Sequence, residues 1–112
     1  MPSALDEHLR RERMRDRLRV DGPLTGLVID LAARTVTVAG EPVSLSCLDF
    51  DLLTHLARHP RCVVSYDELW RKVWDYDGPP DKGVIHKALS RLREKIGQDR
   101  IVCVRGRGYL LR

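Results

Sequence analysis

The chain has 112 residues, of which 43% are hydrophobic and 32% are charged, a composition typical of one small globular domain. No apolar run approaches the roughly 20 residues that a bilayer-spanning helix needs, and the N-terminus lacks an apolar signal core. We therefore expect a cytoplasmic protein with no membrane partner. Three cysteines without C-x-x-C spacing argue against a disulfide framework or a structural zinc site, and predict reduced, partly buried thiols.

The net charge of +4 conceals a polarised distribution of charge along the chain. Residues 82–112 contain nine Lys or Arg against two acids, whereas residues 21–81 contain five basic and ten acidic side chains. Residues 1–20 contain six Arg against four acids. A basic segment of this kind is the electrostatic signature of a protein that binds a polyanion.

The chain is predicted to begin with a charged, helical N-terminal arm over residues 1–22, followed by one domain over residues 23–112. Within residues 4–19 apolar side chains recur at helical spacing, but they fall on two nearly opposite faces. A long coiled coil is therefore not expected. The pattern fits a solvated arm, and it also fits a helix docked on the domain or on a partner.

Three short β-like runs follow a Gly-Pro break, at residues 27–29, 35–38 and 43–45. The segment Ala39-Gly40-Glu41-Pro42 supplies turn-forming residues between the last two runs. These runs predict a small antiparallel sheet near the N-terminus of the domain.

Two helices are then predicted from N-terminal capping signatures. Ser46 is followed three residues later by the carboxylate of Asp49, and Ser65 is followed in the same way by Glu68. Apolar residues recur at helical spacing after each serine, and Pro60 ends the first helix.

A third helix is predicted from Asp81 to Ile96, with Gly97 as its C-cap. Its apolar residues form one stripe, and the opposite face consists mostly of hydrogen-bond donors. Two further β-like runs, 101–104 and 109–111, are joined by the tight turn Arg105–Gly108. The chain is therefore predicted to end in a hairpin with arginine at its tip.

Five stretches, in this order and spacing, carry a family resemblance: Leu45–Leu53, Val63–Leu69, Val73–Trp74, Leu89–Ile96 and Val104–Tyr109. They resemble the OmpR/PhoB-type winged helix-turn-helix effector domain of bacterial response regulators. The resemblance covers about three-quarters of the chain. It implies an α+β fold, a winged helix-turn-helix with a four-stranded N-terminal antiparallel sheet, three helices and a C-terminal β-hairpin wing.

The resemblance also implies a function in transcription regulation. The helix 81–96 would enter the major groove of double-stranded DNA, which is wide enough to admit an α-helix, and the wing 103–109 would contact the minor groove. The chain is thus predicted to be a sequence-specific transcriptional regulator related to two-component phosphorelay proteins, and not an enzyme. The predicted DNA-binding residues are Lys82, His86, Lys87, Ser90, Arg91, Arg93, Arg105 and Arg107.

Partners follow from the same resemblance. In the family, the loop between the second and third helices, here Asp75–Pro80, can touch RNA polymerase, and two copies commonly bind tandem half-sites. This chain departs from the family pattern at Gly83, Ala88 and Cys103, where Arg, His and Thr are common. The family's typical base contacts therefore do not transfer directly to this chain.

No phospho-acceptor receiver domain is expected, because only 26 residues precede the predicted sheet and they show no β-α alternation. The chain would then be a stand-alone DNA binder, a domain excised from a longer protein, or a regulator governed by a partner.

Other functions fit the sequence less well. The main alternative is a winged helix that docks RNA polymerase or a partner regulator through its acidic middle and its helical arm. RNA binding lacks a stacking platform, because most aromatic residues fit the core. His55 and His59 are spaced as a metal pair, but without a third ligand nearby we expect surface or packed histidines. No metal, cofactor or catalytic residue is predicted, because no oxyanion element accompanies His86 and Ser90.

Overall fold

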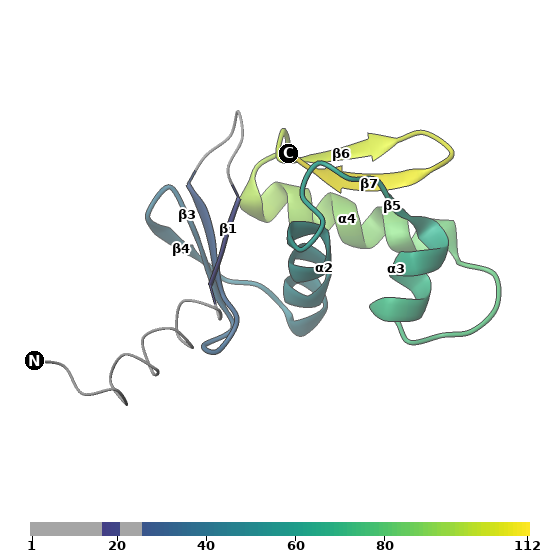
Figure 1. Ribbon diagram of the computed structural model, residues 1–112, viewed down its shortest axis with the longest axis horizontal. Helices are drawn as coiled ribbons and strands as arrows, with labels where there is room; N and C mark the ends of the chain where they lie inside the picture. The colour runs from purple at the N-terminus through teal and green to yellow at the C-terminus, as the bar shows by residue number, and fades with distance from the viewer. Residues whose placement is uncertain (1–16, 21–25) are drawn as a thin grey trace, which may run out of the picture.

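The computed structural model describes residues 17–20 and 26–112 and arranges them as two antiparallel sheets with helices between and beside them (Figure 1). The N-terminal sheet has four strands in the order β1-β2-β3-β4. Their bounds are Arg17–Val20 (β1), Leu27–Asp30 (β2), Thr35–Val38 (β3) and Glu41–Val43 (β4). This sheet packs beside α2, at the end of the molecule away from the hairpin tip.

The strand predicted at 43–45 is wrong in its bounds, because β4 begins two residues earlier. Val38 pairs with Glu41, so the connecting turn contains only Ala39 and Gly40. Both turn residues have positive φ, at +52° and +82°, as the type I′ hairpin turn requires. Pro42 lacks an N–H, and it is tolerated because β4 is an edge strand.

Strand β1 extends the sheet into the stretch that was predicted to be helical. Its residues pair antiparallel with β2, from Arg17 opposite Asp30 to Val20 opposite Leu27. The helical prediction is therefore wrong for residues 17–19, where pairing with a neighbouring strand satisfies the backbone. Residues 1–16 lie outside the described part of the chain, so the rest of the predicted arm, and its division from the domain, remain predictions.

Three helices lie in the described part of the chain, as predicted. They are α2 (Cys47–Ala57), α3 (Tyr66–Lys72) and α4 (Lys82–Ile96). Ser46 and Asp49 form a reciprocal capping box at α2, with both hydrogen bonds 3.1 Å long. Ser65 Oγ accepts from Glu68 N at 3.1 Å, so the capping serine predicted for α3 is confirmed.

The C-terminal sheet has three strands in the order β5-β7-β6. Their bounds are Val64–Ser65 (β5), Ile101–Val104 (β6) and Gly108–Leu111 (β7). Gly108 lies so close to β5 that a Cβ at this position would overlap the Val64 carbonyl oxygen. The predicted hairpin is confirmed, and its second strand also pairs with the short strand that precedes α3.

One hydrophobic core joins the two sheets and the three helices. Fully buried side chains come from each of these layers: Ile29, Leu53, Leu69, Ile85, Leu89 and Leu111. The hairpin β6–β7 lies alongside α4, so the helix and the wing present neighbouring surfaces (Figure 1). Among the described residues, none of the helices has the length and apolar character that crossing a membrane requires.

Candidate nucleic-acid interface

Helix α4 separates a buried apolar face from an exposed polar one. Its buried residues recur at helical spacing: Ile85, Ala88, Leu89, Leu92 and Ile96. They pack toward α2 and α3. Asp81 caps the helix by accepting from Val84 N at 3.1 Å, and Gly97, with φ of +116°, ends it.

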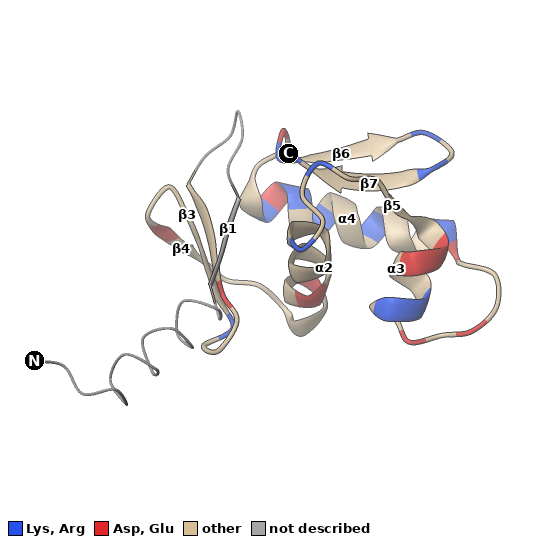
Figure 2. Ribbon diagram, in the orientation of Figure 1, with Lys and Arg blue, Asp and Glu red and all other residues tan. Residues whose placement is uncertain are grey.

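Three predicted contact residues lie on the outer face of α4. Lys87, Ser90 and Arg91 are exposed, and none of their side chains makes a hydrogen bond or ion pair within the residues that the structure describes. Figure 2 shows basic residues along α4 and at the far end of the hairpin. Glu94 is exposed too, and no ion pair joins it to Lys87 or Arg91, so it lowers the positive charge of this face.

Arg93 and His86 lie instead on the side of α4 that faces the hairpin, and both are half-buried. Arg93 Nε donates to the Ile101 carbonyl oxygen at 3.0 Å, and its guanidinium lies 5.8 Å from the Tyr109 ring centroid. His86 Nδ1 is hydrogen-bonded to the Tyr109 hydroxyl, and Nε2 lies 3.5 Å from the Tyr66 hydroxyl. These two side chains therefore fasten α4 to the wing and to α3.

The two tyrosines extend this network toward the first turn of α4. Tyr66 OH lies 3.9 Å from Cys103 Sγ, and Lys82 Nζ lies 5.1 Å from the Tyr66 ring centroid. Burial, together with the neighbouring Cys103 thiol, raises the pKa of both Tyr66 and Tyr109. Both hydroxyls therefore stay protonated and able to donate a hydrogen bond at neutral pH.

The tip of the wing carries the last two predicted contacts. Arg105 and Arg107 are exposed, on either side of Gly106, which has φ of +75°. Arg107 N donates to Val104 O at 2.9 Å and closes the turn. Glycine suits this turn because it reaches positive φ without steric cost. Two guanidinium groups are thus held at the end of a short, paired hairpin.

One basic residue of α4 forms an ion pair with α2. Lys95 is hydrogen-bonded to Asp49, a residue in the first turn of α2 that is only 4% exposed. Burial by itself would raise the pKa of Asp49, but hydrogen bonds from Lys95 and Ser46 outweigh it and lower the pKa. Asp49 therefore stays charged, and the ion pair joins α2 to α4.

An apolar groove next to the outer face was not anticipated from the sequence. Leu48 of α2 and Val84 of α4 are 36% and 42% exposed, and they line a cavity of about 320 Å³ together with Lys87 and Arg91. Exposed apolar side chains on a major-groove surface can meet thymine methyl groups. Their exposure depends on how the two helices pack, so no sequence signal identified them.

The loop between α3 and α4 presents a different surface. Trp70 stacks on Tyr76 with ring centroids 5.5 Å apart, and Trp74 lies at the same distance from Trp70. Tyr76 is 60% exposed, whereas both tryptophans are half-buried against the core. The loop is therefore anchored by aromatic packing and carries exposed acids.

The eight predicted contact residues thus divide into two groups. His86 and Arg93 are bound to the wing, and six side chains are exposed: Lys82, Lys87, Ser90, Arg91, Arg105 and Arg107. The exposed set lies on α4 and the hairpin tip, which are neighbours in space. The geometry is that of a winged helix-turn-helix with a basic helix and a basic wing.

The comparisons with known proteins agree with this class. Residues 40–111 match the family described as "Transcriptional regulatory protein, C terminal". The chain is 44% identical to the transcriptional regulatory protein TrcR of Mycobacterium tuberculosis, over 77% of this chain and 35% of that protein. It is 39% identical to the DNA-binding response regulator MtrA of the same species, over 92% of this chain and 50% of that protein. The chain spans half or less of the length of these relatives.

Solved structures show the same fold. The DNA-binding domain of CpxR from E. coli is 31% identical, with a TM-score of 0.73, over 85% of this chain and 94% of that one. The DNA-binding domain of RstA from Klebsiella pneumoniae, in complex with the RstA box, is 35% identical, with a TM-score of 0.68, over 80% and 94%. The chain therefore belongs to the OmpR/PhoB-type family of transcriptional-regulator C-terminal domains, and the predicted resemblance is confirmed.

Proposed function

We propose that this chain is a sequence-specific, double-stranded DNA-binding transcriptional regulator that acts in the bacterial cytoplasm and has no enzymatic activity. In this proposal α4 enters the major groove and the β6–β7 wing contacts the minor groove. Lys82, Lys87, Ser90 and Arg91 supply the helix contacts, and Arg105 and Arg107 the wing contacts. His86 and Arg93, also predicted to contact DNA, act mainly by positioning the wing.

The observation that carries this proposal is the exposure of Lys87, Ser90 and Arg91 beside a hairpin whose tip holds two arginines. An arginine in the major groove can donate two hydrogen bonds to guanine, and lysine and serine can contact base edges or phosphates. The apolar groove at Leu48 and Val84 adds a surface suited to thymine.

Selection of bound sites from a random duplex library tests this function. We expect an enriched sequence motif, with two half-sites in tandem if two copies bind head to tail. Affinity for the selected duplex should fall steeply with salt, because phosphate contacts release counterions. The proposal fails if a folded sample shows no saturable binding to any duplex near 100 mM salt, a concentration at which specific complexes persist.

The variant Arg105→Ala tests the proposed contact between the wing and DNA. If Arg105 lies on phosphate at the minor groove, the slope of log affinity against log salt should shrink by about one. Arg112→Ala is a matched control, because it removes an exposed arginine that lies outside the wing turn. An equal change in both variants would assign the effect to net charge alone.

A second candidate function is a contact with RNA polymerase through the loop Asp75–Pro80. Exposed Tyr76, stacked on Trp70, supports it, because an anchored aromatic beside acids is suited to a protein partner. Tyr76→Ala should leave affinity for the selected duplex unchanged and reduce promoter activation in a purified transcription reaction. An equal loss of DNA affinity would place Tyr76 in the DNA interface instead.

A further inference from the structure

Two histidines form a pair at the C-terminal end of α2, His55 within the helix and His59 just beyond it. His55 and His59 are one helical turn apart, so their side chains share a face. Their ring centroids are 5.5 Å apart with the planes tilted by 57°. The His55 side chain is 18% exposed, and His59 follows the end of the helix and is exposed. One ring is therefore held by packing and the other is free to adjust.

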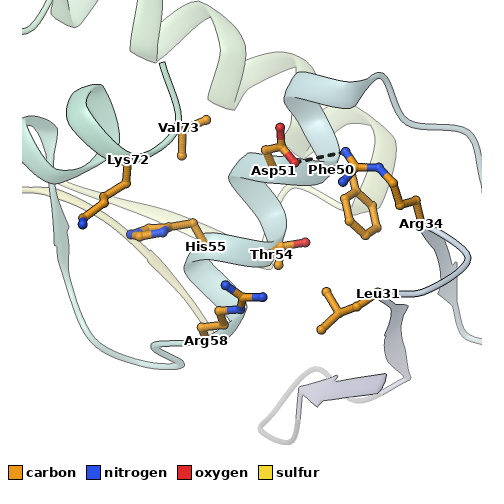
Figure 3. Close-up of a pocket in the computed structure, with 9 residues that line it drawn as sticks. All are labelled: Leu31, Arg34, Phe50, Asp51, Thr54, His55, Arg58, Lys72 and Val73. Atoms are coloured by element: carbon orange, nitrogen blue, oxygen red, sulfur yellow. Dashed lines mark hydrogen bonds and ion pairs between the residues drawn. The ribbon is translucent and has the colours of Figure 1, made fainter. Parts of the chain in front are cut away.

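A third potential ligand reaches this pair from α3. His55 Nε2 lies 2.9 Å from Glu68 Oε2, and each of the three residues offers a ligand atom within 4.8 Å of the others. Glu68 lies in the first turn of α3, where Ser65 Oγ accepts from its backbone N–H. Figure 3 shows His55 extending from α2 toward Lys72, which ends the same short helix. The expectation that no third ligand lies near the histidines is therefore wrong, because folding brings Glu68 to them.

The arrangement is close to what a tetrahedral metal ion requires. With metal–ligand distances near 2.0–2.2 Å, neighbouring ligand atoms lie about 3.4 Å apart. The His55–Glu68 separation is already shorter, and the other separations, all within 4.8 Å, need to shorten by at most about 1.4 Å, a change that rotation of the exposed His59 ring can provide. Two imidazoles and one carboxylate with a fourth position open to water form a known donor set for zinc.

The ligand atoms of the cluster select the kind of metal ion. Two of the three ligand atoms are imidazole nitrogens, and the third is a carboxylate oxygen of Glu68. Arg58 and Lys72 line the same cavity of about 420 Å³ as His55, and so does the ion pair between Arg34 and Asp51, so the nearby charges give no preference for one divalent ion over another. Hard cations such as Mg²⁺ depend on several oxygen ligands and are disfavoured there. Ions that bond well to imidazole, such as Zn²⁺ and Co²⁺, gain from the two nitrogen ligands.

We propose that His55, His59 and Glu68 form a binding site for a divalent transition-metal ion of the Zn²⁺ class, with water at the fourth position. The ion replaces the hydrogen bond between His55 and Glu68, and any proton on the imidazole that it displaces passes to solvent. Coordination ties the C-terminal end of α2 to the start of α3. Because α3 precedes α4 and packs against it, a bound ion stabilises the unit that carries the candidate interface.

Titration of the full chain with Co²⁺ alone tests this site. We expect visible d–d absorption that saturates at one equivalent, is displaced by Zn²⁺, and is unaffected by excess Mg²⁺. His59→Ala and Glu68→Gln should each weaken Co²⁺ binding by more than about tenfold, the loss that even an outer-shell partner can produce. Both variants should still fold, since His59 is exposed and glutamine keeps a hydrogen bond to His55.

The controls separate this cluster from other ligands in the chain. His8→Ala removes an imidazole that is 47 positions before His55 in the sequence, and should leave the titration unchanged. Cys47 and Cys62 are exposed, so the prediction of partly buried thiols is wrong for both. Cys62→Ser removes one of these thiols from a residue whose backbone N–H donates to His59 O at 3.1 Å, and should also leave the titration unchanged. Loss of Co²⁺ binding in either control, or equal binding by His59→Ala and the unmodified chain, would overturn the proposal.

A second readout reports the stabilisation of the helix pair. Excess Zn²⁺ should raise the melting temperature of the unmodified chain by several degrees, because a ligand that binds only the native state stabilises it. The same excess should raise the melting temperatures of Glu68→Gln and His59→Ala by clearly less. A similar shift in all three proteins would show that Zn²⁺ binds elsewhere and would overturn the assignment. Neither readout depends on DNA, so failure here leaves the proposed function untouched.

Discussion

The two sides of α4 use the same residue types for different purposes. Arg93 and His86 face the wing, where their nitrogens are bonded to a strand carbonyl and to tyrosine hydroxyls. Arg91 and Lys87 lie on the outer face and are exposed. Arg91 and Arg93 are two positions apart and identical in chemistry. The comparison shows that the surroundings of an arginine, rather than its charge, decide whether it is available to a ligand.

The largest expected effect is a loss of stability on the wing side of α4. Gly108→Ala would place a Cβ that overlaps the Val64 carbonyl oxygen and lies 2.8 Å from its carbonyl carbon. Relief requires β7 to separate from β5, so the free energy of unfolding should fall by about 3 kcal/mol or more. Urea denaturation measures this change.

Gly106→Ala is the matched control for that variant. It meets no atom within 4 Å, but its φ is +75°, so we expect a loss of only about 1 kcal/mol. Equal losses at the two positions would show that backbone conformation, and not contact with β5, sets the requirement for glycine.

The next largest effect is expected on DNA binding by the outer face of α4. Arg91→Ala should weaken binding to the selected duplex by about 1–3 kcal/mol and relax discrimination at one base pair. Its free energy of unfolding should change by less than about 0.5 kcal/mol, because the side chain is exposed. Fluorescence anisotropy against a panel of single-base variants checks the binding. A uniform loss across all sequences would assign Arg91 to phosphate instead.

The corresponding change on the wing side should lower stability more than it lowers base discrimination. Arg93→Ala removes the donor to the Ile101 carbonyl oxygen and the contact with the Tyr109 ring. We expect the free energy of unfolding to fall by about 1–2 kcal/mol, because the hydrogen bond is charge-assisted and half-buried. Calorimetric melting in the absence of DNA measures it. Unchanged stability together with lost base discrimination would move Arg93 to the DNA-contacting group.

The smallest expected effect is a pH dependence at the ion pair between α2 and α4. The pKa of Asp49 is lowered from its usual value of 3.8, so the folded state binds a proton less readily than the unfolded state. Its stabilising contribution is present above pH 3.8 and is lost as the pH falls through the lower folded-state pKa.

Asp49→Asn isolates that contribution. The difference in free energy of unfolding between the variant and the unmodified chain should be constant near neutral pH and should shrink below about pH 4. Urea titrations across this range measure it. A difference that is independent of pH would show that packing, and not ionisation, makes Asp49 important.

The helices could be predicted closely because their signals are local. Ser46, Ser65, Asp81 and Gly97 each mark a helix end through a hydrogen bond or dihedral angle that involves only residues within a few positions. The hairpin could be predicted equally well, because its two β-like runs and the glycine turn are adjacent in the chain. The family stretches reinforced the same boundaries.

The N-terminal strands were harder for a physical reason. A helical prediction covered residues 17–19, where charged and apolar residues are mixed, and only the partner strand β2 makes them extended. The start of β4 depends on a two-residue turn with positive φ at Ala39, a conformation that alanine seldom adopts. Neither feature is specified by the short segment that contains it.

The amino-acid sequence by itself determined the fold, the family and the concentration of donors on one helix and one hairpin, because periodicity, caps and charge are properties of neighbouring residues. Only the tertiary structure decided which of those donors are exposed and which are bound to the wing. The packing of α4 on the wing lets Arg93 hydrogen-bond to Ile101 and His86 to Tyr109. It also brought Glu68 to His55, although 13 residues separate them in the chain. Contacts of this kind depend on how elements pack, and side-chain spacing along a single segment carries no information about them.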